Sequence, residues 1–186
     1  MPEGGKNLSA LSEAMAGKSI ALVGNASSFV ETPKTLERHQ FVIRMNKGAH
    51  IASEKGNLRT DCLLISAFRG KKYLEAAPHV VWMTPKKRDE LSVKEIAAMY
   101  FYPVPAWEEL FAEIGDRPST GCMGIDLISR RLRGGELWLY GFDFWQSPTT
   151  YTGVIRPGPH SPDAEERFAR SRVPSSQIVG LDASSR

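Results

Sequence analysis

Short apolar runs rich in Val, Ile and Leu alternate along this chain with segments whose apolar residues recur at helical spacing. Parallel strands connected by helices that cover the sheet produce this alternation. We therefore predict an α/β fold with a mostly parallel sheet flanked by helices. The predicted strands are residues 19–23, 40–45, 62–67, 79–84 and 136–142, and the predicted helices are residues 8–16, 90–99, 107–114 and 123–132.

The length and composition of the chain indicate a single domain. Its 186 residues, 41% of them hydrophobic, suffice for one globular core and are too few for two domains of ordinary size. We expect residues 1–18 to form an N-terminal segment with a short helix and residues 19–172 to form the domain. Residues 173–186, which are small and polar, are expected to be a flexible C-terminal tail.

Charge and hydropathy narrow the partners and the compartment. The formal net charge is only +3, with Lys and Arg scattered among Asp and Glu, so the basic footprint of a nucleic-acid binder is missing. No apolar run approaches the roughly 20 residues that span a bilayer, and residues 1–18 lack the apolar core of a signal peptide. We expect a cytoplasmic protein in which Cys62 and Cys122 are buried thiols, since neither cysteine has metal-ligand spacing.

Small polar residues occupy three junctions of the predicted fold. They are Gly24 and Asn25 after the first strand, Asn46 after the second strand, and Ser119, Thr120 and Gly121 before the fourth helix. In open α/β sheets ligands bind at the carboxyl ends of the strands, where helix N-termini offer unpaired N–H groups to anions. Taken singly, the first junction is equally well a Gly-Asn turn and the third is more often a capped helix start. Neither the dinucleotide fingerprint nor the P-loop motif is present, so those two chemistries are disfavoured.

Four segments follow one another in a specific order: V-G-N at 23–25, F-V-I-R-M-N at 41–46, P-S-T-G at 118–121 and L-Y-G-F-D-F-W at 139–145. Together they resemble the sialyltransferases of glycosyltransferase family 29. The first two are similar to that family's large sialyl motif, with Thr60 as its downstream threonine, and the other two are similar to its small motif. The resemblance extends over residues 19–166 and implies a Rossmann-like sheet of the GT-A-variant type.

The family also ends its catalytic region with a His followed five positions later by a Glu, and His160 and Glu165 have this spacing. The residues themselves predict a helix through Arg170, with Ser161 as N-cap and Pro162 as first residue. His160 would then lie just outside a helix N-terminus, where the positive end of the helix dipole disfavours imidazolium. A neutral imidazole is available as a general base near physiological pH.

The resemblance implies an inverting, metal-independent transferase that uses no cofactor and moves an acidic sugar from a CMP-sugar donor to a hydroxyl of a glycan acceptor. In this interpretation His160 is the base, Glu165 supports its loop, and the departing CMP is held by hydrogen-bond donors at the strand and helix ends. The nucleotide-binding residues it implies are Gly24, Asn25, Asn46, Ser119, Thr120 and Gly121. Asp143 has no second acidic neighbour and is interpreted as a hydrogen-bonding residue, not a metal ligand.

The chain departs from the family pattern in several respects. It shows no membrane anchor or stem, Lys18-Ser19 replaces the cysteine that often begins the large motif, and residues 147–153 contain Tyr151 but no histidine. The donor sugar stays open between sialic acid and a Kdo-like acid, since both are anionic 2-keto acid sugars linked to the same nucleotide, and a non-catalytic nucleotide-binding module is the alternative function. A homo-oligomer is also considered, because a short chain leaves little material to enclose an acceptor. The remaining histidines, His39, His50 and His79, are interpreted as structural.

Overall fold

The computed structural model describes residues 4–32, 34–56, 58–67, 70–149, 153, 155 and 158–180. Within these residues seven strands form one sheet in the order β5-β4-β3-β2-β1-β6-β7, and every neighbouring pair is parallel. The strands are β1 (Ser19–Val23), β2 (Phe41–Met45), β3 (Cys62–Ile65), β4 (His79–Trp82), β5 (Tyr100–Phe101), β6 (Glu136–Tyr140) and β7 (Ile178–Val179). The predicted α/β fold with a parallel, Rossmann-like sheet is confirmed.

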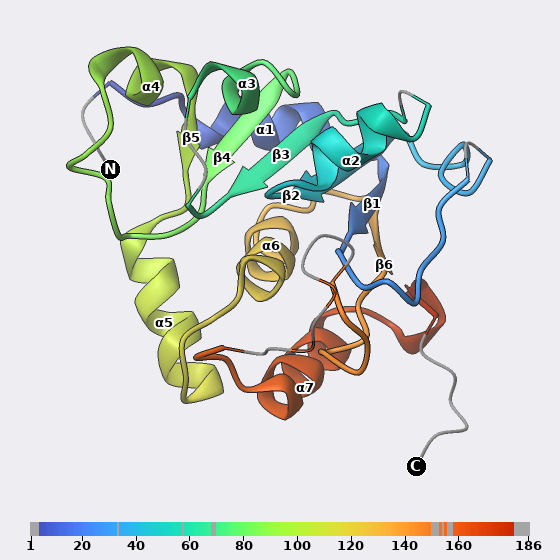
Figure 1. Cartoon of the computed structure of the whole chain (residues 1–186). Coiled ribbons are helices and arrows are strands. Elements are labelled where there is room, and N and C mark those ends of the chain that lie inside the picture. Colours follow the sequence, from blue (N-terminus) through green and yellow to red (C-terminus); the bar gives the residue numbers. More distant parts are fainter. Residues whose placement is uncertain are drawn as a thin grey trace.

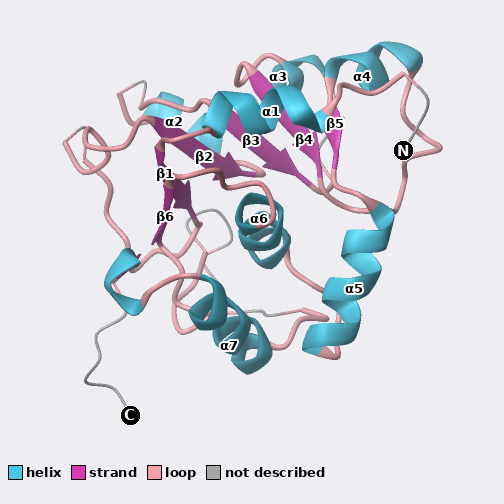
Figure 2. Cartoon of the chain, turned by 180° about the vertical axis from the view of Figure 1, so that it is seen from behind, coloured by secondary structure: helices cyan, strands magenta, loops and turns pink. Residues whose placement is uncertain are grey.

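Helices lie on both sides of the sheet, because successive side chains of each strand point to opposite faces and both sets are apolar. One side carries α1 (Leu8–Met15), α5 (Val104–Ile114), α6 (Thr120–Ser129) and α7 (Pro162–Arg172), and the other carries α2 (Gly48–Glu54), α3 (Lys71–Leu74) and α4 (Val93–Ala98). Figure 1 shows α2, α3 and α4 above the sheet and α5, α6 and α7 below it, and Figure 2 shows the same layers from behind.

Helix α6 is packed tightly against the sheet. Residues 121–128 are all buried, and a Cβ placed on Gly124 would lie 2.8 Å from Leu64 Cδ1 on β3. A helix that is buried all round needs cover on several sides, and α5 and α7 provide it on the side away from the sheet. The N-terminus of α6 is thereby held beside the carboxyl ends of β2 and β3.

The strand order reverses at β1, which pairs with β2 on one side and with β6 on the other. Ligands of open α/β sheets bind in the crevice outside the carboxyl ends of the strands at such a point. Here the loops after β1 and β6 touch, since the Gly24 N–H donates to the Tyr140 carbonyl at 2.7 Å. A Cβ on Gly24 would lie only 2.2 Å from the Gly141 carbonyl oxygen. Gly24 is therefore required for the contact between these two loops.

The five predicted strands are present as β1 to β4 and β6, but β3, β4 and β6 each end two residues earlier than predicted. Strand β3 ends at Ile65 because the next N–H group, that of Ser66, donates to the Asn46 side chain at 3.2 Å instead of to the backbone of a neighbouring strand. The helix predicted over residues 90–99 is shortened to α4 by a capping box between Ser92 and Glu95. The helix predicted from residue 123 begins earlier, at Thr120, because Ser119 is its N-cap.

The ends of the chain belong more closely to the domain than predicted. The predicted N-terminal helix is present as α1, and its buried residues join the core cluster that contains β1 and α6. The C-terminal tail was expected to begin at residue 173, yet Val173 is buried and Ile178 pairs with Leu139 in the β6–β7 ladder. The physical reason is that Val173 and Ile178 are apolar residues that the edge of the sheet buries. Residues 181–186 lie outside the described residues.

Among the described helices, none combines the length and the apolar character that crossing a membrane requires.

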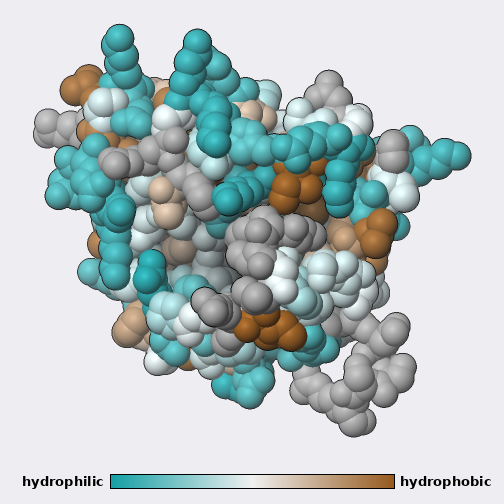
Figure 3. All heavy atoms as spheres, in the orientation of Figure 1, coloured by the Kyte–Doolittle hydropathy of each residue, from teal (hydrophilic) through white to brown (hydrophobic). Residues whose placement is uncertain are grey.

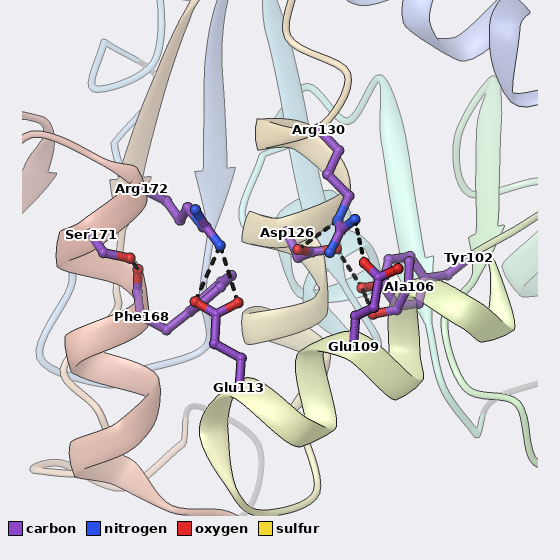
Figure 4. Close-up of polar contacts among 9 residues, drawn as sticks. All are labelled: Tyr102, Ala106, Glu109, Glu113, Asp126, Arg130, Phe168, Ser171 and Arg172. Carbon is purple, nitrogen blue, oxygen red and sulfur yellow. Dashed lines mark hydrogen bonds and ion pairs between the residues drawn. The ribbon is translucent and has the colours of Figure 1, made fainter.

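Polar contacts between α5, α6 and α7 close the lower side of the molecule (Figure 4). The buried Tyr102 hydroxyl donates to Asp126 Oδ2 at 2.5 Å, and Arg130 Nε donates to the same carboxylate at 2.8 Å. Arg130 also pairs with Glu109 of α5 at 2.8 Å. Asp126 is only 2% exposed, so its charge depends on these donors for stabilisation.

We predict that Tyr102→Phe destabilises the fold. The substitution removes one donor from a buried carboxylate, which costs roughly 1 to 3 kcal/mol in the free energy of unfolding. The matched control is Glu113→Gln, which removes an exposed 3.1 Å ion pair to Arg172 and should cost less than about 1 kcal/mol. Urea unfolding followed by tryptophan fluorescence measures both, and equal losses in the two variants would contradict the prediction.

Candidate functional site

A pocket of about 630 Å³ lies at the carboxyl ends of β1, β2 and β6, beside the N-terminus of α6. This volume is within the range of roughly 300 to 1,000 Å³ that is usual for small-molecule sites. All eight residues that the sequence singled out for a site line this one pocket: Gly24, Asn25, Asn46, Ser119, Thr120, Gly121, His160 and Glu165. The pocket thus unites residues from five separate segments, while their individual roles stay predictions.

Glu165 connects α7 to the start of α6. Its side chain is buried, with Oε1 accepting the Ser119 N–H at 2.7 Å and Oε2 accepting the Ser119 hydroxyl at 2.5 Å. Burial raises the pKa of Glu165 to about 7, with a smaller contribution from the charge of Asp116, although both hydrogen bonds from Ser119 act in the opposite direction. Glu165 therefore holds the first turn of α6 and changes its charge near neutral pH.

The first turn of α6 keeps two N–H groups for a ligand. The Ser119 N–H is used by Glu165, and the Cys122 N–H donates to the Ser119 hydroxyl at 3.1 Å. For the N–H groups of Thr120 and Gly121, by contrast, the described part of the chain supplies no acceptor. Both residues line the pocket at the positive end of the helix dipole, an arrangement that favours an anion.

Asn46 connects β2 to β3 and to α6. Its backbone has the left-handed φ of 52°, which asparagine tolerates better than most residues. Its Oδ1 accepts the Ser66 N–H, and its Nδ2 donates to Thr120 Oγ1 at 3.4 Å. Ser66 and Thr120 hydroxyls lie 2.7 Å apart. Ser66 was missed by sequence reasoning, although its place directly after β3 matches the place of Asn46 directly after β2.

Asn25 keeps more of its side chain for a ligand than Asn46 does. Its Nδ2 makes a long bond of 3.5 Å to the Met45 carbonyl. Its Oδ1 has no hydrogen-bond donor among the described residues. The amide of Asn46, in contrast, is used on both sides within the protein.

His160 has a defined tautomer. Its Nδ1 lies 2.7 Å from the Arg117 carbonyl oxygen, which can only accept, so Nδ1 carries the proton and Nε2 is the basic nitrogen of the neutral ring. Burial lowers the pKa of His160 below its ordinary value of 6.5, and the charge of Arg117 lowers it further. A lowered pKa favours the neutral imidazole, and burial is the main cause of the lowering. The predicted cap of α7 is present at Ser161, but without a side-chain hydrogen bond.

Asp143 connects the loop after β1 with the loop after β6. Its carboxylate accepts the Ser28 hydroxyl at 3.0 Å, the Ser147 N–H at 3.0 Å and the Ser147 hydroxyl. The interpretation of Asp143 as a hydrogen-bonding residue is confirmed. Within the described ranges, no group of three or more His, Cys, Asp or Glu side chains is placed to hold a metal ion.

Aromatic residues form the wall of the pocket after β6. Phe142, Phe144 and Trp145 all line it, and the Trp145 ring stacks on the His160 imidazole at 5.6 Å between centroids. Phe144 and Trp145 have left-handed φ values of 49° and 63°, which cost bulky L-residues roughly 1 to 3 kcal/mol each. Tyr151, the aromatic residue within residues 147–153, lies outside the described residues.

Other motif residues serve the fold. Arg44, within the F-V-I-R-M-N segment, is buried and makes two bonds to the Glu31 carboxylate at 2.6 and 2.7 Å. Its Nε donates to Thr60 Oγ1 at 3.0 Å, so Thr60 supports the same arginine. These contacts hold the long loop between β1 and β2 against the sheet.

The structural interpretation of the remaining histidines and both cysteines agrees with their contacts. His39 lies between the Ser19 and Tyr140 hydroxyls at 2.9 and 2.8 Å, and burial lowers its pKa to about 4. His50 packs on Tyr73 and His79 contacts the Tyr100 hydroxyl. Cys62 and Cys122 are free and buried, and burial raises the pKa of each thiol.

Comparison with solved structures supplies the decisive likeness. A crystal structure of a mammalian sialyltransferase aligns with a TM-score of 0.60 and 17% sequence identity, covering 87% of this chain and 68% of that chain. The fold is sialyltransferase-like. No sequence-family profile matches the chain, and no curated protein sequence gives a significant match.

In this sialyltransferase-like fold the pocket lies where the strand order reverses. Hydrophilic side chains dominate the surface on the opposite side of the sheet. Figure 3 shows these side chains over α2, α3 and α4, the layer on the far side of the sheet from α6. Among the described residues that line the pocket, none is Lys or Arg. Any negative charge of a ligand there would therefore be stabilised mainly by N–H groups and the dipole of α6.

We predict that Glu165→Gln changes how stability depends on pH. Glu165 titrates near 4.5 when unfolded and near 7 when folded, so its stabilising contribution is complete below pH 4.5 and is lost as pH rises through 7. The stability of the wild type relative to Glu165→Gln should fall by roughly 2 to 4 kcal/mol across that window.

Urea unfolding of both proteins at half-unit pH steps from 4.5 to 8 measures this difference. His39 and His160 titrate in both proteins, so their contributions cancel when the two curves are subtracted. A difference that stays constant with pH would contradict the raised pKa of Glu165.

Proposed function

We propose that this chain is an inverting, metal-independent glycosyltransferase that moves sialic acid or a Kdo-like acidic sugar from a CMP-sugar donor to a hydroxyl of a glycan. One observation supports the proposal: a single pocket brings together His160, whose Nδ1 donates to Arg117 and leaves Nε2 as the basic nitrogen, and the Thr120 and Gly121 N–H groups of α6, for which the described residues supply no acceptor. These are the two groups that a displacement at an anomeric carbon with a phosphate leaving group requires.

The reaction begins with the base. His160 Nε2 accepts the proton of the acceptor hydroxyl while the acceptor oxygen attacks the anomeric carbon of the donor. The bond between that carbon and the phosphate oxygen breaks, and its electron pair leaves with CMP. Attack from the face opposite to CMP inverts the configuration. His160 ends the step as imidazolium, and the Arg117 carbonyl continues to accept its Nδ1–H.

The departing phosphate is held at α6. The N–H groups of Thr120 and Gly121 donate to its oxygens, and the helix dipole adds positive potential. Gly121 also lets Phe142 pack against the first turn of α6, since a Cβ there would lie 2.9 Å from Phe142 Cε1. Asn25 is the residue best placed to bind ribose or base, because its Oδ1 has no donor within the described part of the chain. Asn46 acts mainly by holding Thr120.

We expect CMP to bind more tightly than AMP or NAD, and EDTA to leave binding and transfer intact, because helix N–H groups and not a cation hold the phosphate. Calorimetry with the three nucleotides tests the first part. Release of CMP from CMP-sialic acid and from CMP-Kdo, with and without EDTA, tests the second. Tighter binding of NAD, or activity that returns only on addition of Mg²⁺ or Mn²⁺, would contradict the proposal.

We expect His160→Gln to lower transfer by about 10²- to 10⁴-fold while CMP affinity stays unchanged, because glutamine can donate to Arg117 but has no basic nitrogen. In the wild type, activity should fall only as pH drops below 6.5, since the pKa of His160 is lowered from that value. The matched control is His50→Gln, which removes a histidine that does not line the pocket.

Two outcomes would contradict the role of His160. Transfer at the wild-type rate in His160→Gln would exclude this residue as the base. If His160→Gln loses CMP binding and the wild type shows no transfer, His160 is a nucleotide contact. That result would favour the non-catalytic binding module.

A further inference from the structure

The imidazole of His160 is held on two sides. Its Nδ1–H donates to the Arg117 carbonyl at 2.7 Å, and the Trp145 ring stacks on it with an angle of 24° between the ring planes. The two contacts restrict different motions, because the hydrogen bond fixes which nitrogen carries the proton and the stacking opposes rotation of the ring about its Cβ–Cγ bond. Together they allow one orientation of the imidazole.

The backbone that presents Trp145 is held by the carboxylate of Asp143. The Gln146 N–H donates to the Asp143 carbonyl at 3.1 Å, closing a tight turn in which Phe144 and Trp145 both have positive φ. Asp143 is 8% exposed and accepts hydrogen bonds from Ser28 and Ser147. Bulky residues keep a left-handed backbone only where surrounding contacts enforce it, and such positions concentrate at functional sites.

We propose that Trp145 is a positioning residue that holds the His160 imidazole in the single orientation in which Nδ1 donates to Arg117 and Nε2 remains free to accept a proton. The proposal rests on the proposed role of His160 as base. Trp145 itself takes no proton. Its contribution is to keep the basic nitrogen in place and to exclude water from one face of the ring.

The charged groups around His160 do not account for this orientation. Arg117 and Asp116, both in the loop before α6, act on the imidazole with opposite signs. Glu165 on α7 and Asp143 after β6 also line the pocket, but their carboxylates accept hydrogen bonds from serines. The Arg117 carbonyl selects the nitrogen that donates, and stacking by Trp145 is the contact that holds the plane of the ring.

The test is an NMR titration of His160 in the wild type and in Trp145→Phe, Trp145→Leu and Trp145→Ala. The chain has four histidines, and the His160 signal is assigned by its loss in His160→Gln. Nitrogen-15 shifts of the imidazole report the tautomer, and the titration reports the pKa. Phenylalanine preserves stacking, leucine preserves bulk without stacking, and thermal melting confirms that each variant is folded.

In the wild type and in Trp145→Phe we expect the Nδ1–H tautomer and a pKa below the ordinary value of 6.5. In Trp145→Leu and Trp145→Ala we expect both tautomers, with the pKa closer to that value. The acid limb of the rate profile should move to higher pH in these two variants, and kcat at pH 7 should fall roughly 10- to 100-fold. CMP affinity should not change.

The outcomes separate the two proposals. An unchanged tautomer and pKa in Trp145→Leu and Trp145→Ala would overturn the positioning role, whatever the activity. If Trp145→Leu and Trp145→Ala show altered tautomers but the wild-type protein transfers no sugar from either CMP-sugar, the proposed function is overturned. The role of Trp145 in orienting His160 then remains.

Discussion

A buried carboxylate at the beginning of a helix holds this structure together at its site. Glu165 lies on α7, yet both of its oxygens accept bonds from Ser119, the cap of α6. Removing a carboxylate from water is unfavourable, and the N–H group, the hydroxyl and the helix dipole offset part of that cost. The same contact fixes how α7 packs on α6, and with it the position of His160, which lies directly before the N-cap of α7. The geometry of the pocket therefore depends on a carboxyl group whose pKa is about 7.

Much of the fold could be predicted from sequence because its long-range order is a consequence of burial. Strands covered on both faces are predominantly apolar, and β1 to β4 and β6 show this directly. The two-residue strands β5 and β7 are too short to create a pattern, and α3 has only four residues. Ile178 joins the sheet through a pairing with Leu139, and no local feature of the small, polar residues around it announces that partner. What escaped prediction was decided by tertiary contacts.

The candidate site follows the same division. Polar residues after parallel strands converge because the strands share a direction, which is why Asn25, Asn46 and the start of α6 meet in one pocket. The sequence does not predict that the Asn46 side chain makes hydrogen bonds with Ser66 and Thr120, since these depend on the distance between β3 and α6. Nor does it predict that Trp145 stacks on His160, because two consecutive left-handed residues turn the chain against ordinary preference.

The contact between the Gly24 and Gly141 backbones has a consequence for how the pocket can change shape. Because no side chain separates the two loops, the strands on either side of the reversal meet through main-chain atoms, with the Gly24 N–H bonded to Tyr140 and the Ala26 N–H bonded to Gly141. These hydrogen bonds resist sliding of β1 past β6, since such a movement would break them. The part of the pocket formed by the loops after β1 and β6 therefore resists deformation. Any change in the shape of the pocket would come from lining residues outside these two loops.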